Sequence, residues 1–552
     1  MGGYDDSVPG RPGPGSPGSP GSSGSPGSAR AAGGAGGGAR APRGGGPGPS
    51  RRSLLVAAGG LGLAGVGGAV LWRSLGDDGP GGAAAGPAPR TPAPSQTPSP
   101  VTGADDASPE LQGLLDAGDA RVVLPEGSHV LRSGLVVPPH VREIEVPEGT
   151  VLTMAGDEVL LRRNGRIEQQ PRQVVTAVQG ADAVRLADVS GIRAGAWVYL
   201  CSDDWLKEGK SKRGMLRRVE AVEGDLLRVD KPLISSLSTA PRAHVVALAP
   251  SLALTGAGAL ENADPQGTFS NLVRLDFVES PEVAGVELRF CGSAALRTFG
   301  TVGGTIDAYI HDCVDDQGRN HYGYGVSCTS TTRDLRVLGR IERVRHAFTT
   351  DHGYDALVES IAQTGEPEDI YVAPRVRETS STGIDTHEPG DGITIVPDIE
   401  GCGTMKWGGM NVRARNVTIQ GGTVRDSNEW GIFVQPSAGG TTVIRDVEVS
   451  GVRDGRGVHC KAGARIEGGS VSGFGDRFGI HIEPGTTVDV EGTRIDGGQA
   501  DGSRGIALAG TSCSLTGTVA NCSVGVLELP DASDNRVLLD YDNVAREVIS
   551  AT

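Results

Sequence analysis

The residues best suited to chemistry lie in two short segments, Arg345–His352 (RHAFTTDH) and Ser381–Asp391 (STGIDTHEPGD). Carboxylates and imidazoles placed together can move protons to and from a substrate, and a nearby arginine can stabilise developing negative charge. A cation from the next copy of the same sequence pattern, Arg413, completes this combination. The predicted catalytic group is therefore His346, Asp385, His387 and Arg413.

Both segments belong to a repeated motif, a short strand that usually begins with glycine. Successive copies begin 20 to 26 residues apart, with a single longer step of 37 residues, and this period is typical of solenoids. The second and fourth residues of each copy are mostly apolar or small, and the third and fifth are mostly polar. One set therefore faces a core and the other faces outward. The nine copies begin at Gly325, His346, Gly383, Gly409, Gly431, Gly457, Gly479, Gly505 and Gly525.

One period, from Gly431 to Gly457, contains three short strands and no helix pattern. Three strands per repeat indicate a parallel β-helix, an all-β fold. The step of 37 contains about a dozen residues more than a coil needs, around Tyr354 to Gly365. We expect this excess to project from the solenoid.

Stacked coils place equivalent residues about 4.8 Å apart, so outward residues form columns. The predicted third-position column is Ser327, Phe348, Asp385, Asn411, Phe433, His459, His481 and Ala507, and the fifth-position column is Thr329, Thr350, His387, Arg413, Gln435, Lys461, Glu483 and Ala509. Outward positions are polar on any soluble sheet, and Lys461 with Glu483 could be an ordinary surface ion pair. The predicted binding residues are Asn411, Phe433, Gln435, His459, Lys461, His481 and Glu483.

The N-terminal part of the chain differs in composition from the rest. Residues 1–50 are rich in Gly, Pro and Ser and are predicted to be disordered, and residues 76–107 form a Pro/Ala/Thr-rich linker. Residues 51–75 resemble a twin-arginine export signal, with Arg51 and Arg52 before a weakly apolar run. This segment predicts a secreted protein, or one that stays anchored in the membrane through residues 54–72 if the signal is not cleaved.

The folded domain is predicted over residues 108–552, beginning with an amphipathic helix over 109–117 that Ser108 caps. The helix and the following VVLPEG resemble the opening of the pectate lyase-like superfamily. This resemblance implies a right-handed parallel β-helix whose first coil is plugged by the helix. Residues from about 174 to 248 alternate like antiparallel strands and predict a small inserted β-rich subdomain. Its aromatic residues Trp197, Tyr199 and Trp205 could contact sugar, although packing is the expected role of two of them.

RHAFTTD and GIDTHEPGD also resemble segments of bacterial and phage β-helix proteins that act on polysaccharides, including tailspike-type proteins. The resemblance implies an exported polysaccharide-degrading enzyme, either a lyase or a glycoside hydrolase. The alternative is a non-catalytic glycan-binding or surface-display protein, since the fold alone does not decide function.

The two reactions need different groups. Hydrolysis uses two carboxyls about 5 to 9.5 Å apart, whereas Asp385 and Glu483 lie four coils, or roughly 19 Å, apart. The possible partners of Asp385 are Asp351, Glu388 and Asp391. β-Elimination needs a base and a cation, such as His387 or His459 with Arg413 or Lys461.

Bulk properties limit the remaining possibilities. The net charge is −16, and residues 1–108 contribute eight Arg against six Asp, so the exported part is more acidic still. This charge argues against nucleic acid as a partner. We expect no cofactor, although Asp385, Glu388 and Asp391 could gather calcium. The eight cysteines are expected to be buried free thiols, with Cys513 and Cys522 the pair to test for a bridge, and the oligomeric state stays open.

Overall fold

The structure is a computed structural model that describes residues 105–316, 318, 321–351, 365–453 and 455–551. The predictions for residues 1–50, for the export signal at 51–75 and for most of the linker lie outside this part, as does nearly all of the excursion after Tyr354. Among the described residues, no helix is both long enough and apolar enough to cross a membrane.

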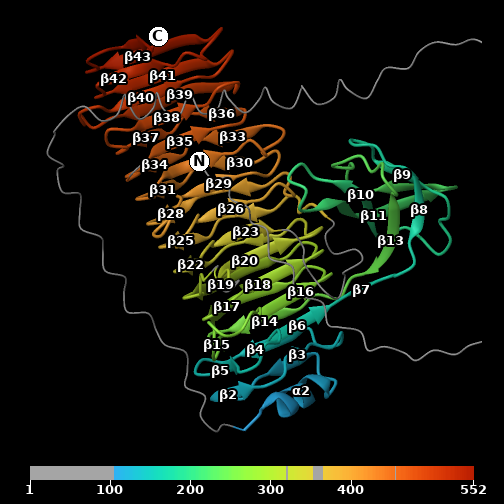
Figure 1. Cartoon of the computed structure of the whole chain (residues 1–552). Helices are drawn as coiled ribbons and strands as arrows, with labels where there is room; N and C mark the ends of the chain where they lie inside the picture. Colours follow the sequence, from blue (N-terminus) through green and yellow to red (C-terminus); the bar gives the residue numbers. More distant parts are fainter. Residues whose placement is uncertain (1–104, 317, 319–320, 352–364, 454, 552) are drawn as a thin grey trace, which may run out of the picture. The chain divides into compact units, whose positions relative to one another are not determined.

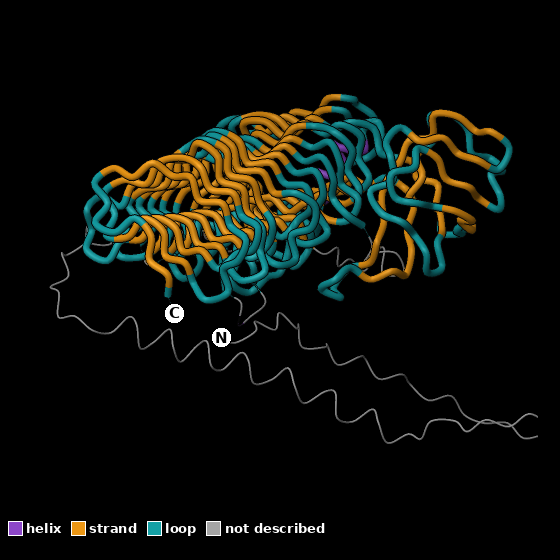
Figure 2. Tube along the Cα trace, turned by 90° about the horizontal axis from the view of Figure 1, so that it is seen from above, coloured by secondary structure: helices purple, strands orange, loops and turns teal. Residues whose placement is uncertain are grey.

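The described chain forms a parallel β-helix of the right-handed type, as predicted (Figure 1). Viewed from above, the strands of successive coils stack in layers that are joined by loops (Figure 2). One layer is a 14-stranded parallel sheet with one strand per coil. Its strands, in spatial order, are β3 (Leu135–Val136), β6 (Leu161–Asn164), β16 (Val273–Asp276), β18 (Ala294–Phe299), β20 (Tyr324–Thr329), β23 (Phe348–Asp351), β26 (Ile384–Thr386), β29 (Met410–Val412), β32 (Trp430–Val434), β35 (Arg456–Cys460), β38 (Phe478–Ile482), β40 (Arg504–Leu508), β42 (Val524–Glu528) and β44 (Val548–Ser550).

The other strands of the coils form a 23-stranded sheet that contributes two strands, or one long bent strand, to each coil. Three strands per coil were predicted, and β32, β33 and β34 show the pattern in one coil. The strands are β1 (Arg121–Val123), β2 (Ser128–Leu131), β4 (Glu143–Val146), β5 (Val151–Met154), β14 (Ala253–Gly256), β15 (Ala259–Asn262), β17 (Glu282–Arg289), β19 (Thr305–His311), β21 (Arg336–Val337), β22 (Arg340–Glu342), β24 (Tyr371–Val372), β25 (Arg375–Arg377), β27 (Thr394–Ile395), β28 (Asp398–Glu400), β30 (Thr418–Gln420), β31 (Thr423–Arg425), β33 (Thr442–Arg445), β34 (Glu448–Ser450), β36 (Ala464–Glu467), β37 (Ser470–Ser472), β39 (Val488–Asp496), β41 (Ser514–Ala520) and β43 (Arg536–Asp542).

The core of the β-helix consists of the inward residues of each strand, mostly Val, Ile and Leu. The repeated glycine is buried near the start of the strand, as Gly431 is in β32. A Cβ added at Gly431 would lie 2.3 Å from Cγ1 of Val449, so a larger residue would displace the core there. All eight cysteines are buried free thiols, as expected, including Cys513 and Cys522.

The N-terminal helix α2 (Ser108–Asp116) buries Leu111 and Leu115 against the first coil. The predicted role of Ser108 as its cap is wrong, because Ala107 is the N-cap and makes no side-chain cap hydrogen bond. The Ser108 hydroxyl instead accepts hydrogen bonds from the backbone N–H groups of Arg132 and Ser133. It therefore ties the helix to the turn after β2.

A seven-stranded antiparallel sheet is inserted between β6 and β14 and forms a separate body with its own core (Figure 1). Tyr199 is fully buried and packs edge-on against Phe277 of the β-helix, while Arg333 lies over the ring of Trp197. Trp205 is exposed. The strands are β7 (Arg166–Ile167), β8 (Arg172–Thr176), β9 (Ala183–Leu186), β10 (Trp197–Trp205), β11 (Lys212–Glu223), β12 (Leu226–Val229) and β13 (Arg242–Ala247).

Ion pairs hold this inserted sheet on the β-helix. Arg217 of β11 pairs with Glu368, and both side chains are almost completely buried. Arg333 of the β-helix reaches back to Asp230, 2.8 Å away. Each buried charge needs a partner of opposite charge, so these two pairs favour one position of the inserted sheet beside the coils.

Candidate functional site

The outward side chains of the 14-stranded sheet form three columns, which we call the strip. The third-position column contains Thr349, Asp385, Asn411, Phe433, His459 and His481. Next to it, the fifth-position column contains Asp351, His387, Arg413, Gln435, Lys461 and Glu483.

The structure corrects the predicted columns at one coil. Phe348 pairs with Val326 and is fully buried in the core, while Asp351 pairs with Thr329. Phe348 and Thr350 were predicted one residue out of register because His346 was matched to the repeat glycine, a position that Ala347 occupies. In a strand a shift of one residue exchanges the two faces.

A third outward column was missed. It consists of the residue that precedes each repeat glycine, and its signal in the sequence is the bulky or charged side chain found there in most coils. His346 belongs to this column and stacks on Tyr324, with ring centroids 5.4 Å apart. Other members are Trp430, Arg456, Phe478 and Arg504.

The four predicted catalytic residues come together on the strip. Nη2 of Arg413 donates to Oδ2 of Asp385 and to Nε2 of His387, each at 2.9 Å. Nε2 of His346 lies 3.6 Å from the same Asp385 oxygen. Residues from three coils thus surround one carboxyl group.

Hydrogen bonds define the protonation states of the two imidazoles. Nδ1 of His346 donates to the Thr382 carbonyl at 2.6 Å, which leaves Nε2 as an acceptor in the neutral ring. Burial lowers the pKa of His346 well below its usual value, so the ring is neutral. Because an arginine can only donate, Nε2 of His387 accepts and its proton lies on Nδ1.

Asp385 has the properties of a proton donor. Its side chain is 2% exposed, and burial raises its pKa despite the opposing charge of Arg413. Its Oδ1 has no hydrogen-bond partner among the residues that the structure describes. An unpaired buried oxygen costs about 1–3 kcal/mol, and such an atom is expected where a ligand supplies the missing partner.

Asn411, in the next coil, presents a second unpaired atom. Gln435 donates to its Oδ1 at 2.5 Å, which fixes the orientation of the amide. Its Nδ2 is buried and has no partner within the described part of the chain. A ligand oxygen lying between Asn411 Nδ2 and a protonated Asp385 Oδ1 could accept a hydrogen bond from each.

Stacked rings make up the next three coils of the strip. Phe433 and His459 stack with centroids 4.6 Å apart, and His459 and His481 at 4.9 Å. His459 donates from Nε2 to Glu483 at 2.8 Å. Burial lowers the pKa of His481 to about 3, and although burial opposes it, the hydrogen bond from His459 lowers the pKa of Glu483 to about 2.

His459, His481 and Glu483 also place ligand atoms within 4.8 Å of one another, as a metal site would require. However, Nε of Arg456 donates to Nδ1 of His481 at 2.7 Å, and Nζ of Lys461 lies 3.9 Å from Glu483. Two adjacent cations and an occupied imidazole lone pair disfavour a metal ion here.

The possible calcium ligands are used in other ways. Both oxygens of Glu388 accept backbone N–H groups, from Lys207 at 2.5 Å and from Glu208 at 2.6 Å. Asp391 pairs with Arg415 at 3.0 Å. The carboxylates of Glu388 and Asp391 are therefore already engaged in contacts within the protein.

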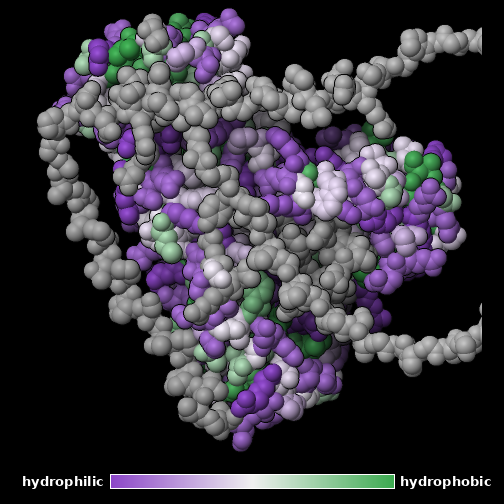
Figure 3. All heavy atoms as spheres, in the orientation of Figure 1, coloured by the Kyte–Doolittle hydropathy of each residue, from purple (hydrophilic) through white to green (hydrophobic). Residues whose placement is uncertain are grey.

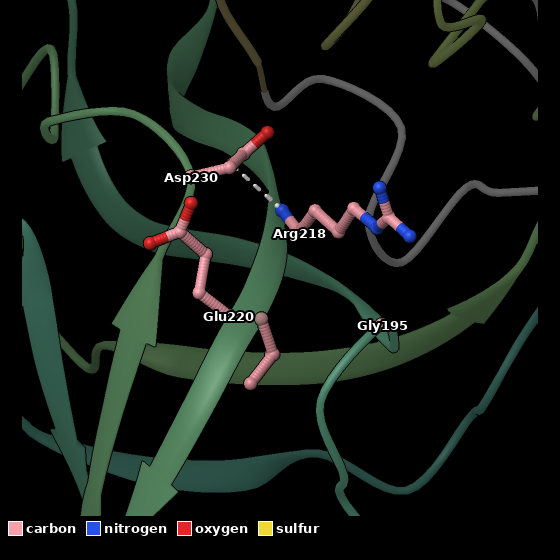
Figure 4. A pocket seen from close by; sticks show the side chains of 5 residues that line it. Gly195, Arg218, Glu220 and Asp230 are labelled. Atoms are coloured by element: carbon pink, nitrogen blue, oxygen red, sulfur yellow. Dashed lines mark hydrogen bonds between the residues drawn. The ribbon is translucent and has the colours of Figure 1, made fainter.

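Away from the strip, a shallow hollow of about 340 Å³ lies on the inserted sheet (Figure 4). Gly195, Arg218, Glu220 and Asp230 line it, and its one drawn contact runs from the Arg218 backbone N–H to Asp230. It contains no strip residue. The visible described surface is mainly hydrophilic, with scattered small apolar patches (Figure 3).

No protein-family model and no curated protein matches the chain. Three similar solved structures are phage tailspikes. Gp54 of Acinetobacter baumannii bacteriophage AP22, in complex with A. baumannii capsular saccharide, is 12% identical with a TM-score of 0.48, over 81% of this chain and 74% of that one. The gp61 tailspike of Pseudomonas phage phi297 is 15% identical with a TM-score of 0.48, over 78% and 72%.

The third, gp49 of Pseudomonas phage LKA1, is 13% identical with a TM-score of 0.47, over 80% of this chain and 71% of that one. Similarity at this level assigns neither an activity nor a ligand to this chain. Its function must be judged from the geometry of the strip.

Proposed function

We propose that this protein cleaves a polysaccharide by hydrolysis, with Asp385 as the proton donor. The observation that carries the proposal is Asp385 Oδ1, a buried oxygen without a partner among the described residues, on a carboxyl group whose pKa is raised by burial. A glycosidase needs an acid that remains protonated until it transfers its proton to the glycosidic oxygen.

The contacts of Asp385 suit that role in both protonation states. With the proton on Oδ1, Oδ2 still accepts from Arg413. After the proton has passed to the leaving oxygen, the same arginine stabilises the carboxylate that is left. Asn411 Nδ2, beside it, is positioned to hold a sugar hydroxyl during the transfer.

Elimination fits the same atoms less well. It needs a cation that faces the uronate carboxylate and a base with an open lone pair. Nη2 of Arg413 already bridges Asp385 and His387, and it occupies the Nε2 lone pair of His387. In the alternative pair, Nζ of Lys461 lies 3.9 Å from the Glu483 carboxylate, so its charge already faces an acid of the protein.

The stacked part of the strip would hold the rest of the sugar chain. Phe433, His459 and His481 follow Asp385 along consecutive coils, and His481 lies four coils from it, roughly 19 Å along the β-helix. Lys461 and Gln435 flank these rings in the fifth-position column. Rings with polar neighbours bind sugars through apolar faces and hydroxyl groups together.

These stacked rings also favour a second candidate, a protein that holds a glycan without cleaving it. Binding alone would use the rings of the strip and would not need the raised pKa of Asp385. The two candidates therefore differ in what the Asp385 carboxyl does, not in where the glycan lies.

We infer from Arg51, Arg52 and the apolar run after them that the chain is exported, either secreted or retained through residues 54–72. An extracellular glycan would then be the accessible partner. Replacing both arginines by lysine should abolish export in a twin-arginine-competent host; unchanged export would contradict this inference.

The reaction is tested by incubating the protein with a panel of capsular, exopolysaccharide and pectic polymers. New reducing ends and the ultraviolet absorbance of unsaturated products are measured in parallel. Hydrolysis predicts reducing ends without the absorbance, and elimination predicts both. Binding with neither signal on every polymer would support the binding protein and overturn the proposal.

A further inference from the structure

The hairpin between β10 and β11 of the inserted sheet contacts residues that are next in the chain to members of the strip. The backbone N–H groups of Lys207 and Glu208 both donate to the carboxylate of Glu388, next in the chain to His387. Nζ of Lys207 donates to the carbonyl of Pro436, at 3.0 Å, next to Gln435. The hairpin tip is thus held at two points beside the coils that contain Asp385, Arg413 and Gln435.

The side chain of Glu208 takes no part in this anchoring. Its carboxylate has no hydrogen bond or ion pair with any residue that the structure describes, and the side chain is half-buried. Burial is the main cause of the raised pKa of Asp385, and the negative charge of Glu208 raises it further. The same charge acts on Glu388. The Glu208 carboxylate is therefore within electrostatic range of the proton donor.

We propose that Glu208 is the second catalytic carboxylate of the site, supplied by the inserted sheet to a proton donor on the β-helix. This inference rests on the hydrolysis proposed above and names the group that the reaction still lacks. The catalytic centre then consists of two parts of the fold, with Asp385 on β26 and Glu208 on the β10–β11 hairpin.

The other nearby carboxylates are less suitable. Glu388 and Asp391 are used in backbone and arginine contacts. Asp351 lies one coil from Asp385 at a diagonal position, and Arg297 lies 3.7 Å from its carboxylate. Glu208 differs from these groups because its backbone N–H anchors the hairpin, while its carboxylate makes no contact with another described residue.

Asp385 and Glu208 make no direct contact with each other among the described atoms, and the proposed reaction places a water molecule between them. Asp385 gives its proton to the glycosidic oxygen as the C1–O bond breaks, and the bonding electron pair stays with that oxygen. The water oxygen bonds to C1, and one of its protons passes to Glu208. Transfer of this proton through solvent back to Asp385 restores the site. The products are an alcohol on the leaving sugar and a hemiacetal whose C1 has the inverted configuration.

The test uses the full-length protein and the polymer that it cleaves best in the panel. Glu208→Gln should lower kcat/KM by about 10³-fold with an unchanged Tm, because the anchoring contacts come from the backbone. The matched control is Glu220→Gln, an exposed glutamate of the same sheet, which should keep the wild-type rate. With Glu208→Ala, added azide should restore turnover and give a glycosyl azide.

Three results are decisive. Inversion at C1, seen by proton NMR of the first product, together with azide rescue, supports the assignment. A rate for Glu208→Gln within threefold of Glu220→Gln overturns it while the proposed hydrolysis stands, and a large loss in Asp351→Asn would then identify the partner. If the wild type cleaves no polymer of the panel, the hydrolysis itself fails.

Discussion

Two buried histidines on different faces of the β-helix show what distinguishes the strip. His311, on β19 of the 23-stranded sheet, has Glu287 on one ring nitrogen and Asp312 on the other, each at 2.6 Å. His346, on the strip, bonds to one backbone carbonyl and lies 3.6 Å from Asp385. Burial lowers both pKa values, but the two carboxylates outweigh it at His311, whose pKa is raised.

The two histidines belong to different kinds of network. In a closed network every buried carboxylate has a partner within the protein, and in an open network some buried polar atoms have none. Around His311 each carboxylate has a cation as partner, since Asp312 also binds Arg343 and Glu287 also binds Arg289. On the strip, Asp385 and Asn411 each keep one buried atom without a partner among the described residues. A closed network stabilises a fold, whereas unpaired buried atoms lower stability and are retained where a ligand binds.

The largest expected effect comes from removing the acid of the open network. Asp385→Asn should lower the rate of cleavage by about 10² to 10⁴-fold, because the amide cannot give up a proton. Calorimetry should show a Tm near that of the wild type, and isothermal titration should show that an oligosaccharide product still binds. Cleavage at the wild-type rate would remove Asp385 from the chemistry.

The closed network should respond in the opposite way. Asp312→Asn leaves His311 and Arg343 without their shared carboxylate, so we expect a loss of roughly 2 kcal/mol in unfolding free energy and no loss of cleavage per folded molecule. Urea denaturation and the reducing-end assay measure the two quantities. Lost cleavage in a folded Asp312→Asn protein would contradict the division into two networks.

A histidine of the strip, His481, and the histidine of the closed network, His311, predict opposite pH dependence. The lowered pKa of His481, about 3, means that the unfolded chain binds its proton more readily, so this residue's contribution to stability is lost as the pH falls from 6.5 towards 3. For His311 the raised pKa makes the contribution present below pH 6.5 and lost as the pH rises through the raised value.

His481→Phe, which keeps the stacked ring, should therefore flatten the stability profile. Between pH 4 and 6 the unfolding free energy of the wild type should rise more steeply than that of the variant, by about 1.4 kcal/mol per pH unit. Urea unfolding at pH 4, 5 and 6 measures the two slopes. Parallel profiles would show that His481 titrates as an ordinary histidine.

The smallest effect concerns binding on the stacked part of the strip. Nδ1 of His459 is buried and has no hydrogen-bond partner in the described ranges. His459→Phe keeps the stack with Phe433 but removes this nitrogen, together with the internal hydrogen bond to Glu483. The affinity for an oligosaccharide should fall about fivefold to tenfold, which corresponds to one ligand hydrogen bond of about 1–1.4 kcal/mol. Titration calorimetry on the inactive Asp385→Asn background measures it, and an unchanged Kd would place the glycan elsewhere.

The sequence predicted the β-helix and the clustering of the candidate residues because both follow from the repeat. The buried glycine near the start of each strand and the alternation after it determine which residues face outward. Stacking then brings Asp385, His387 and Arg413 together from neighbouring coils. The register failed only where Ala347 replaces the glycine, and that failure placed Phe348 on the wrong face.

The contribution of the inserted sheet could not be predicted in this way. The backbone N–H of Glu208 donates to Glu388, which lies 180 residues further along the chain. No period of the sequence relates the two positions. Contacts between a solenoid and an insertion depend on how the two surfaces pack, which neither alternation nor repeat length encodes. For the same reason the sequence could not show that both carboxylate oxygens of Glu388 accept hydrogen bonds from the hairpin.

The central claim, that Asp385 is a proton donor held in an open network, is tested most directly by its own titration. Carbon-13 NMR of protein labelled at the aspartate carboxyl, with Asp385→Asn used to assign the resonance, gives its pKa. The pKa of Asp385 should lie above the ordinary aspartate value of about 3.9. A value at or below it would mean that Arg413 holds Asp385 as a permanent carboxylate, and the strip would then be a binding surface without an acid.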